Sequence, residues 1–306
     1  MTLVFSHSDH DGHVTPPGHP ERVDRLCAVE VGLQGLAVTR RESPLAPLDD
    51  VTRCHPRAYA DRILAAVPTE GWAQIDGDTF LSPGSLAAAL RAVGGAGAAV
   101  DAVLAGQDKT AFVACRPPGH HAEKTTAMGF CLFGTVAIAA KRALDHHGLS
   151  RVAIVDFDVH HGNGTQDLLW DEGRCLFASS HQMPLYPGTG SVRETGAQGQ
   201  IVNAPLPGGS DGDHMRRVYD TLIFPRLVHW QPELILISAG FDAHAQDPLA
   251  GLLWQSADYR WLTERICEIA HDCAGGRVVS CLEGGYDLNA LTESVAAHVG
   301  VLARQG

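Results

Sequence analysis

The stretch Asp156-Phe157-Asp158-Val159-His160-His161 directly follows a short apolar run at residues 152–155. Such a β-branched run is typical of a buried strand in a parallel sheet. An extended backbone sends alternate side chains to one face, so Asp156, Asp158 and His160 point the same way. Clustered carboxylates repel one another unless a cation joins them, and carboxylate and imidazole are ordinary zinc ligands. The simpler interpretation, helix-capping aspartates beside a loop histidine, suits a single Asp better than the whole run. The run therefore predicts a metal site.

Short apolar runs alternate with longer helical patterns along the rest of the chain. Strands are predicted at residues 3–5, 111–114, 152–155, 176–178, 234–237 and 277–280. Apolar residues near a 3.6-residue period predict helices at 22–36, 56–67, 86–104, 134–147, 258–271 and 288–302. Two segments rich in Pro, Gly and polar residues, 43–50 and 192–212, are predicted to be surface loops. This βαβ order predicts an α/β fold with an open, mostly parallel sheet flanked by helices, formed by one domain over residues 1–306.

Composition excludes several classes of function. The formal net charge of −12 disfavours binding to nucleic acid, which requires a basic face. No window approaches the ~18 consecutive apolar residues of a membrane span, so no membrane association is expected. Eight cysteines without a Cys-x-x-Cys pair, and an amino terminus without a basic and apolar leader, favour a reducing, cytoplasmic location. Nucleotide chemistry is disfavoured because neither a complete Gly-x-Gly-x-x-Gly fingerprint nor a Walker-type loop occurs.

Polar clusters follow successive predicted strands. They lie at residues 117–121, 156–161, 179–181, 240–242 and 283–286. The carboxyl ends of the strands in an open parallel sheet line a common crevice, so clusters that are distant in sequence can meet there. We expect the active site at this edge of the sheet.

The predicted metal ligands are Asp158, His160 and Asp242. Three protein ligands leave an open position for water, as in catalytic zinc sites. Such a metal acidifies its water and polarises a carbonyl, which favours hydrolysis. Tyr286 is a candidate donor to the oxyanion of a tetrahedral intermediate. A two-manganese ureohydrolase site is disfavoured because the sequence shows no second set of Asp and His ligands.

The adjacent histidines His120 and His121 are candidates for proton transfer. They follow a stiff Pro-Pro-Gly segment, and imidazole titrates where such transfers occur. Asp156 and Asn163 are available as hydrogen-bond partners. A carboxylate favours the imidazolium form and an amide does not, so the two rings are predicted to hold different protonation states.

Seven blocks, in order, carry a resemblance to a known family. They are Gly18-His19-Pro20-Glu21-Arg22, Arg116-Pro117-Pro118-Gly119-His120-His121-Ala122, Met128-Gly129-Phe130-Cys131, Asp156 to Thr165, Tyr186-Pro187-Gly188-Thr189-Gly190, Ser238-Ala239-Gly240-Phe241-Asp242-Ala243 and Glu283-Gly284-Gly285-Tyr286. Through these seven blocks the chain resembles the zinc-dependent histone deacetylase and acetylpolyamine amidohydrolase family over nearly its whole length. Class II deacetylases and bacterial histone deacetylase-like amidohydrolases are the most similar branch. The resemblance implies the arginase/deacetylase fold.

The resemblance also implies roles for individual residues. Zinc, or Fe(II) in similar sites, would bind to the three ligands named above. Tyr286 would polarise the amide carbonyl, and His121 would be the general base that later protonates the leaving amine. His120 would be an electrostatic partner held by Asp156, and Asn163 would orient His121.

Further implied sites concern potassium and substrate. A structural potassium ion would lie near Asp156, Asp158, His160, Ser179 and Ser180, partly bound through backbone oxygens. Gly129, Phe130 and Tyr186 would line a narrow tunnel for an acylated lysine, and Arg22 would match an arginine of an internal channel.

Two positions bear on the substrate. Leu249 follows Asp247-Pro248, where the polyamine-selective branch has a glutamate, so a free cationic amine would find no dedicated partner. The acidic residue that clamps a substrate backbone in some deacetylases has no match in residues 79–83. The expected reaction is removal of acetyl or other acyl groups from Nε-acyl-lysine in a peptide or protein, or from a small acylated amine. The alternatives are an acetylpolyamine deacetylase and a non-catalytic acyl-lysine reader that keeps metal and tunnel.

Overall fold

A parallel sheet of eight strands forms the centre of the molecule. The computed structural model describes residues 1–305. The strand order is β2-β1-β5-β10-β9-β6-β7-β8, and each neighbouring pair in it is parallel. The strands are β1 (Thr2–Ser6), β2 (Val38–Glu42), β5 (Thr110–Val113), β6 (Val152–Asp156), β7 (Cys175–Gln182), β8 (Ile201–Leu206), β9 (Leu234–Ala239) and β10 (Val278–Leu282). The open parallel α/β architecture predicted from the sequence is confirmed.

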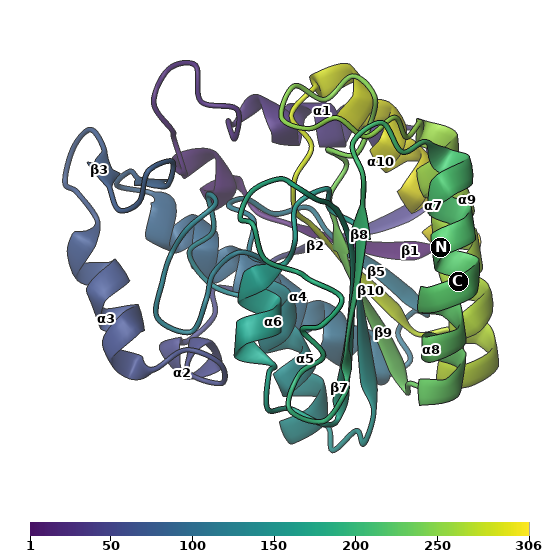
Figure 1. Ribbon diagram of the computed structural model, residues 1–306. Coiled ribbons are helices and arrows are strands. Elements are labelled where there is room, and N and C mark those ends of the chain that lie inside the picture. Colours follow the sequence, from purple (N-terminus) through teal and green to yellow (C-terminus); the bar gives the residue numbers. More distant parts are fainter. Residues whose placement is uncertain (306) are drawn as a thin grey trace.

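Helices cover both faces of this sheet (Figure 1). On one face lie α4 (Ser85–Leu104) and α5 (Thr135–Asp145); on the other lie α9 (Ser256–Ala274) and α10 (Leu288–Leu302), with α1 (Asp24–Gly32) packed against α10. The remaining elements are a 3-10 helix (Ser8–Gly12), α2 (Leu48–Val51), α3 (Arg57–Ala66), the hairpin of β3 (Ala73–Gln74) and β4 (Phe80–Leu81), α6 (Asn163–Leu168), α7 (Gly212–Val218), a π-helical turn (Tyr219–Ile223) and α8 (Phe224–Trp230). All six predicted helices and all six predicted strands are present, with shifted ends.

Three local predictions were wrong. Segment 192–212 contains β8, five of whose six residues are buried against its neighbour β7, so it is not all surface loop. Segment 43–50 contains the start of α2. Strand β7 continues to Gln182, so residues 179–181 lie within it and not beyond its end. These elements were not predicted because their proline and polar residues resemble a loop, and an edge strand or a short helix needs few apolar side chains.

Burial of whole strands explains the stability of the sheet. All five residues of β6 and all six of β9 are buried, as expected where helices cover both faces of a parallel sheet.

Helix α4 has the length and composition of a membrane span, but 67% of its 18-residue apolar window is buried inside the fold. It behaves as a core helix.

The connections of β6 and β9 create the crevice. These two strands are neighbours, yet β6 leads to β7 on one side and β9 leads to β10 on the other. The loops that leave the two strands therefore diverge, and ligands bind at such a switch point in α/β sheets. The predicted metal ligands lie in these two loops.

Candidate active site

Asp158, His160 and Asp242 converge at the switch point. Asp158 and His160 lie in the loop after β6, and Asp242 lies in the loop after β9. His160 Nδ1 is 3.1 Å from both Asp158 Oδ1 and Asp242 Oδ2, and one possible ligand atom from each residue lies within 4.8 Å of the others. The three residues are only 1%, 8% and 0% exposed, respectively. In the described residues this is the one group of three or more Asp, Glu, His or Cys side chains with such spacing.

Backbone N–H groups hold the two carboxylates in place. Gly284 N donates to Asp158 Oδ2 and Val159 N donates to Asp242 Oδ1, each at 2.8 Å. A Cβ at Gly284 would lie 2.2 Å from Asp242 Oδ2, so only glycine permits this approach. Burial and the neighbouring Asp158 raise the pKa of Asp242, which is the electrostatic cost that a divalent cation removes. Two oxygen donors and one nitrogen donor therefore fit a zinc-type ion with an open position.

His120 is paired with a carboxylate. Its Nδ1 donates to Asp156 Oδ2 at 3.0 Å, and its Nε2 lies 3.8 Å from Asp158 Oδ1. Burial lowers the pKa of His120, but the charges of Asp158 and Asp156 outweigh burial and hold this pKa well above its usual value. Burial raises the pKa of Asp156 only to about 6. At neutral pH the proton therefore belongs to His120, which is an imidazolium.

The imidazole of His121 differs from that of His120 in its protonation. Its Nδ1 donates to Asn163 Oδ1 at 2.7 Å. Burial and the neighbouring positive charge of His120 hold the pKa of His121 well below its usual value. The ring is therefore neutral at pH 7, with the lone pair on Nε2. The two adjacent histidines differ in charge, as the sequence analysis expected, but burial and the charge of His120, and not the amide partner, lower the pKa of His121.

Tyr286 is positioned through its backbone. Its N–H donates to Asp247 Oδ2 at 2.7 Å, and Asp247 Oδ1 accepts from Leu249 N at 3.0 Å. The same carboxylate thus ties Tyr286 to the loop that carries Leu249. Burial holds the pKa of Tyr286 well above its usual value, so its hydroxyl remains a hydrogen-bond donor.

Arg22 does not lie in an internal channel, and that expectation was wrong. Its side chain is 51% exposed and pairs with Asp24. Arg25 is the buried arginine: its guanidinium lies 4.9 Å from the ring centroid of Tyr286 and donates to the carbonyl oxygen of Gly285 at 2.7 Å. Arg22 precedes α1, whereas Arg25 lies in its first turn and on its buried face.

Glu283 has a contact that the sequence analysis did not assign. The carboxylate is buried and accepts from the backbone N–H groups of Gly119 at 2.6 Å and His120 at 3.1 Å. Burial raises the pKa of Glu283 to about 7. The residue therefore fixes the backbone of the paired histidines from the adjacent strand end. An acid directly after a buried strand was the signal for this role.

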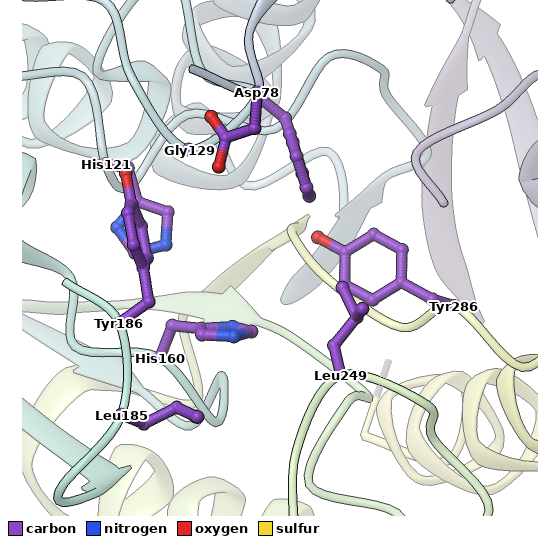
Figure 2. A pocket seen from close by; sticks show the side chains of 9 residues that line it. Asp78, His121, Gly129, His160, Leu185, Tyr186, Leu249 and Tyr286 are labelled. Atoms are coloured by element: carbon purple, nitrogen blue, oxygen red, sulfur yellow. The ribbon is translucent and has the colours of Figure 1, made fainter. Parts of the chain in front are cut away.

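A cavity of about 240 Å³ joins the catalytic candidates to the surface (Figure 2). All four predicted substrate-binding residues line it. The lining consists of Asp78, His121, Gly129, Phe130, His160, Leu185, Tyr186, Leu249 and Tyr286. The Tyr286 hydroxyl and the Asp78 carboxylate both point into the space (Figure 2). Asp78 and Leu185 were missed: Asp78 lies one residue before the segment searched for an acidic clamp, and no motif marks Leu185.

Gly129 and Phe130 form an unusual piece of tunnel wall. Both have positive φ, 54° and 67°. A Cβ at Gly129 would lie 2.4 Å from His121 Cδ2. Left-handed backbone at a bulky residue is rare and persists only where surrounding contacts hold it. Here Phe130 N donates to Thr79 Oγ1 at 3.0 Å, which ties the wall to the segment that carries Asp78.

The residues predicted to bind potassium include Asp158 and His160 of the Asp-His-Asp cluster and the neighbouring ends of β6 and β7. Strand pairing places Ser179 beside Asp156. The two serine hydroxyls already have partners, since Ser179 Oγ is 3.0 Å from His181 Nδ1 and Ser180 Oγ is 2.7 Å from Tyr219 Oη. Within residues 1–305, no hydrogen-bond donor reaches the carbonyl oxygens of Asp158 or His160. The carbonyl oxygens of the backbone, and not the serine hydroxyls, are thus the oxygen atoms available to bind a cation here.

Comparisons with known proteins agree with this geometry. The family model of the histone deacetylase domain matches residues 17–302. The chain is 38% identical to "Histone deacetylase 10, chloroplastic" of Oryza sativa subsp. japonica, over 96% of this chain and 71% of that protein. It is 38% identical to a histone deacetylase-like amidohydrolase of Pseudomonas aeruginosa, over 90% of this chain and 75% of that protein. The crystal structure of the HDA15 HD domain superposes with a TM-score of 0.92 at 31% identity, over 98% of this chain and 90% of that one.

These matches confirm the arginase/deacetylase fold that the resemblance implied. They cover the loops that carry the Asp158–His160–Asp242 cluster, the paired histidines and Tyr286. This chain therefore belongs to the histone deacetylase family of deacetylases and amidohydrolases.

Proposed function

We propose that this protein is a zinc-dependent amidohydrolase that removes acetyl or other acyl groups from Nε-acyl-lysine. One observation carries the proposal: His160 of the buried Asp-His-Asp cluster, His121 and Tyr286 line the same narrow cavity. A candidate metal site, a neutral base and a hydroxyl donor would thus face a single bound amide. Fe(II) is a second candidate ion, because carboxylate and imidazole ligands also suit it.

Each protein group has a separate role in the proposed hydrolysis. When bound, the metal acidifies a water molecule and polarises the amide carbonyl. His121 is neutral and accepts the proton at Nε2, then returns it to the leaving amine. His120 keeps its positive charge near the site and favours the negative charge that develops there. The Tyr286 hydroxyl donates to the carbonyl oxygen as it becomes an oxyanion.

The cavity wall suits an uncharged alkyl chain. Phe130, Leu185 and Tyr186 supply apolar surface, which matches the methylene groups of an acylated lysine. Leu249 offers no charge to a free amine, and Asp78 supplies the one carboxylate of the lining. We further propose a structural potassium ion at the carbonyl oxygens of Asp158 and His160, beside Asp156, Ser179 and Ser180, because these carbonyls lack other partners.

A panel of substrates tests the proposed reaction. We expect the zinc-loaded wild-type protein to hydrolyse acetyl-lysine peptides with a kcat/KM at least about tenfold above that for acetylputrescine and acetylspermidine, a difference of about 1.4 kcal/mol. The measurement is release of acetate or free amine under matched conditions. Equal or faster turnover of the polyamines would overturn the interpretation of Leu249. Binding of acyl-lysine without turnover of any substrate would favour the reader function.

Asp78 provides a second test, because its half-buried carboxylate points into the cavity and can accept a peptide N–H. We expect Asp78→Ala to raise the KM for an acetyl-lysine peptide about tenfold with little change in kcat, which is the loss of one hydrogen bond to a charged group. Asp78→Asn keeps an acceptor and should lose less. A small uncharged acetylated amine without flanking peptide bonds should be unaffected. An unchanged peptide KM in Asp78→Ala would contradict this role.

A further inference from the structure

We propose that Glu123 is a positioning residue that fixes the tautomer of His121 through Asn163. This inference deepens the proposed function and rests on it, because it concerns how the proposed base is kept basic. Glu123 follows the paired histidines by two positions, and no motif or family block drew attention to it. The proposal rests on a chain of two short hydrogen bonds.

The chain runs from the tunnel to the surface. His121 Nδ1 donates to Asn163 Oδ1 at 2.7 Å, and Asn163 Nδ2 donates to Glu123 Oε1 at 2.7 Å. Asn163 is buried as the first residue of α6, whereas Glu123 is half-buried. The second group near Asn163 Nδ2 is Met128 Sδ at 3.4 Å, a weak acceptor. Both neighbours of the amide nitrogen are therefore acceptors.

An amide at this place needs orientation because its two ends differ. With Oδ1 toward His121, the ring must carry its proton on Nδ1, and Nε2 is free to act as a base. If the amide flipped, its NH₂ group would face Nδ1. The ring proton would then move to Nε2, and the ring would present a donor to the cavity. A carboxylate in place of Asn163 would accept through either oxygen and would need no such control.

Glu123 selects the orientation of the amide because its carboxylate oxygen accepts the hydrogen bond from Asn163 Nδ2. A flipped amide would place Oδ1 against Glu123 Oε1, two acceptors at hydrogen-bond distance, which is repulsive. The turn that presents Glu123 is braced: Glu123 N donates to Thr126 O at 2.9 Å, and Lys124 N donates to Asp167 Oδ2 at 2.7 Å. The carboxylate is thus held against the amide by the local backbone.

The first experiment removes the acceptor-only character with minimal change in shape. Glu123→Gln can present either its oxygen or its NH₂ group to Asn163, so it no longer selects one orientation. We expect kcat to fall about tenfold with KM nearly unchanged, because the base and not the tunnel is affected. The matched control is Glu268→Gln, which removes the same charge from an exposed position on α9. Its kcat should equal that of the wild type.

The second experiment asks whether the effect depends on the amide. In an Asn163→Asp background, the group that faces Glu123 is itself a carboxylate, so Glu123 no longer orients it and instead repels it. Glu123→Gln should then leave kcat unchanged or raise it. A residue that only supports the loop would cost the same in both backgrounds, so equal losses would overturn the proposal.

A spectroscopic readout separates this inference from the proposed function. Histidine-labelled ¹⁵N NMR of the zinc-loaded protein, with the His121 signals assigned by their loss in His121→Gln, should show a proton on Nδ1 in the wild type. Glu123→Gln should add the Nε2-protonated form. If the wild type is inactive but Glu123→Gln still shifts the His121 tautomer, the proposed function is refuted and the role of Glu123 is supported. If the wild type is active but Glu123→Gln changes neither kcat nor the His121 tautomer, the inference alone is refuted.

Discussion

Tyr286→Phe should lower kcat for acetyl-lysine hydrolysis by about 10²–10³, the usual cost of one lost oxyanion donor. The substitution removes only the hydroxyl, which points into the cavity between His160 and the walls (Figure 2). Within the described residues that hydroxyl has no protein partner, so its hydrogen bond is available to the substrate alone. The pKa of Tyr286 lies well above its usual value because of burial, so the group donates throughout the neutral range.

The measurement combines steady-state kinetics with metal analysis. Bound zinc and thermal stability should match the wild type, because Tyr286 is not a ligand and its ring remains beside Arg25. Tyr59→Phe is the matched control: its buried hydroxyl donates to Leu132 O at 2.6 Å, away from the cavity. The control should lose about 1 kcal/mol of stability and keep its kcat. Unchanged turnover in Tyr286→Phe would refute the oxyanion role.

Asp242→Asn should abolish both metal binding and hydrolysis. A neutral amide replaces one of the two charged ligands, while the shape of the side chain and its backbone partner Val159 N remain. Loss of an outer partner of a metal ligand already costs about 10–100-fold in affinity, so loss of a ligand charge should exceed that range. We expect the dialysed variant to hold little zinc and to show no measurable deacetylation.

The same variant tests whether metal binding stabilises the fold. A ligand that binds only the folded state raises Tm, so a chelator should lower the Tm of the wild type and leave that of Asp242→Asn unchanged. Asp211→Asn is the matched control, because this carboxylate caps α7 through His214 N and lies outside the metal cluster. It should bind a full equivalent of zinc. Normal zinc content in Asp242→Asn would refute the three-ligand site.

Local sequence patterns were sufficient for the central elements. Strands β6 and β9 are continuous apolar runs, and such runs between helical patterns indicate a buried parallel sheet. The edge strand β2 was missed because none of its five residues is fully buried, so its sequence carries no strong apolar pattern. Strand β8 was missed for a related reason, since its asparagine and proline resemble loop residues.

Several site residues lay beyond such patterns. Arg25 and Arg22 are equivalent in type, but Arg22 precedes α1 and is exposed, whereas Arg25 lies on the buried face of α1 beside Tyr286. Asp78 lines the cavity because the β3–β4 hairpin turns it there, next to the Phe130 wall. Side-chain contacts between loops depend on how those loops pack against each other. The spacing of residues in the sequence does not predict this packing.

The sequence by itself determined the chemistry: the Asp156, Asp158 and His160 run, the paired histidines and the tyrosine after β10 are marked by residue type and by their positions after apolar runs. The expected strand alternation does not extend to Asp158 and His160, because β6 ends at Asp156. Tertiary structure alone decided which groups meet and in what charge state. Asp242 reaches His160 because β6 and β9 are neighbours, and Glu123 reaches Asn163 because two loops pack together. Burial lowers the pKa of both His120 and His121. The charges of Asp158 and Asp156 outweigh burial at His120 and hold its pKa well above the usual value, whereas the positive charge of His120 adds to burial at His121 and holds that pKa well below the usual value.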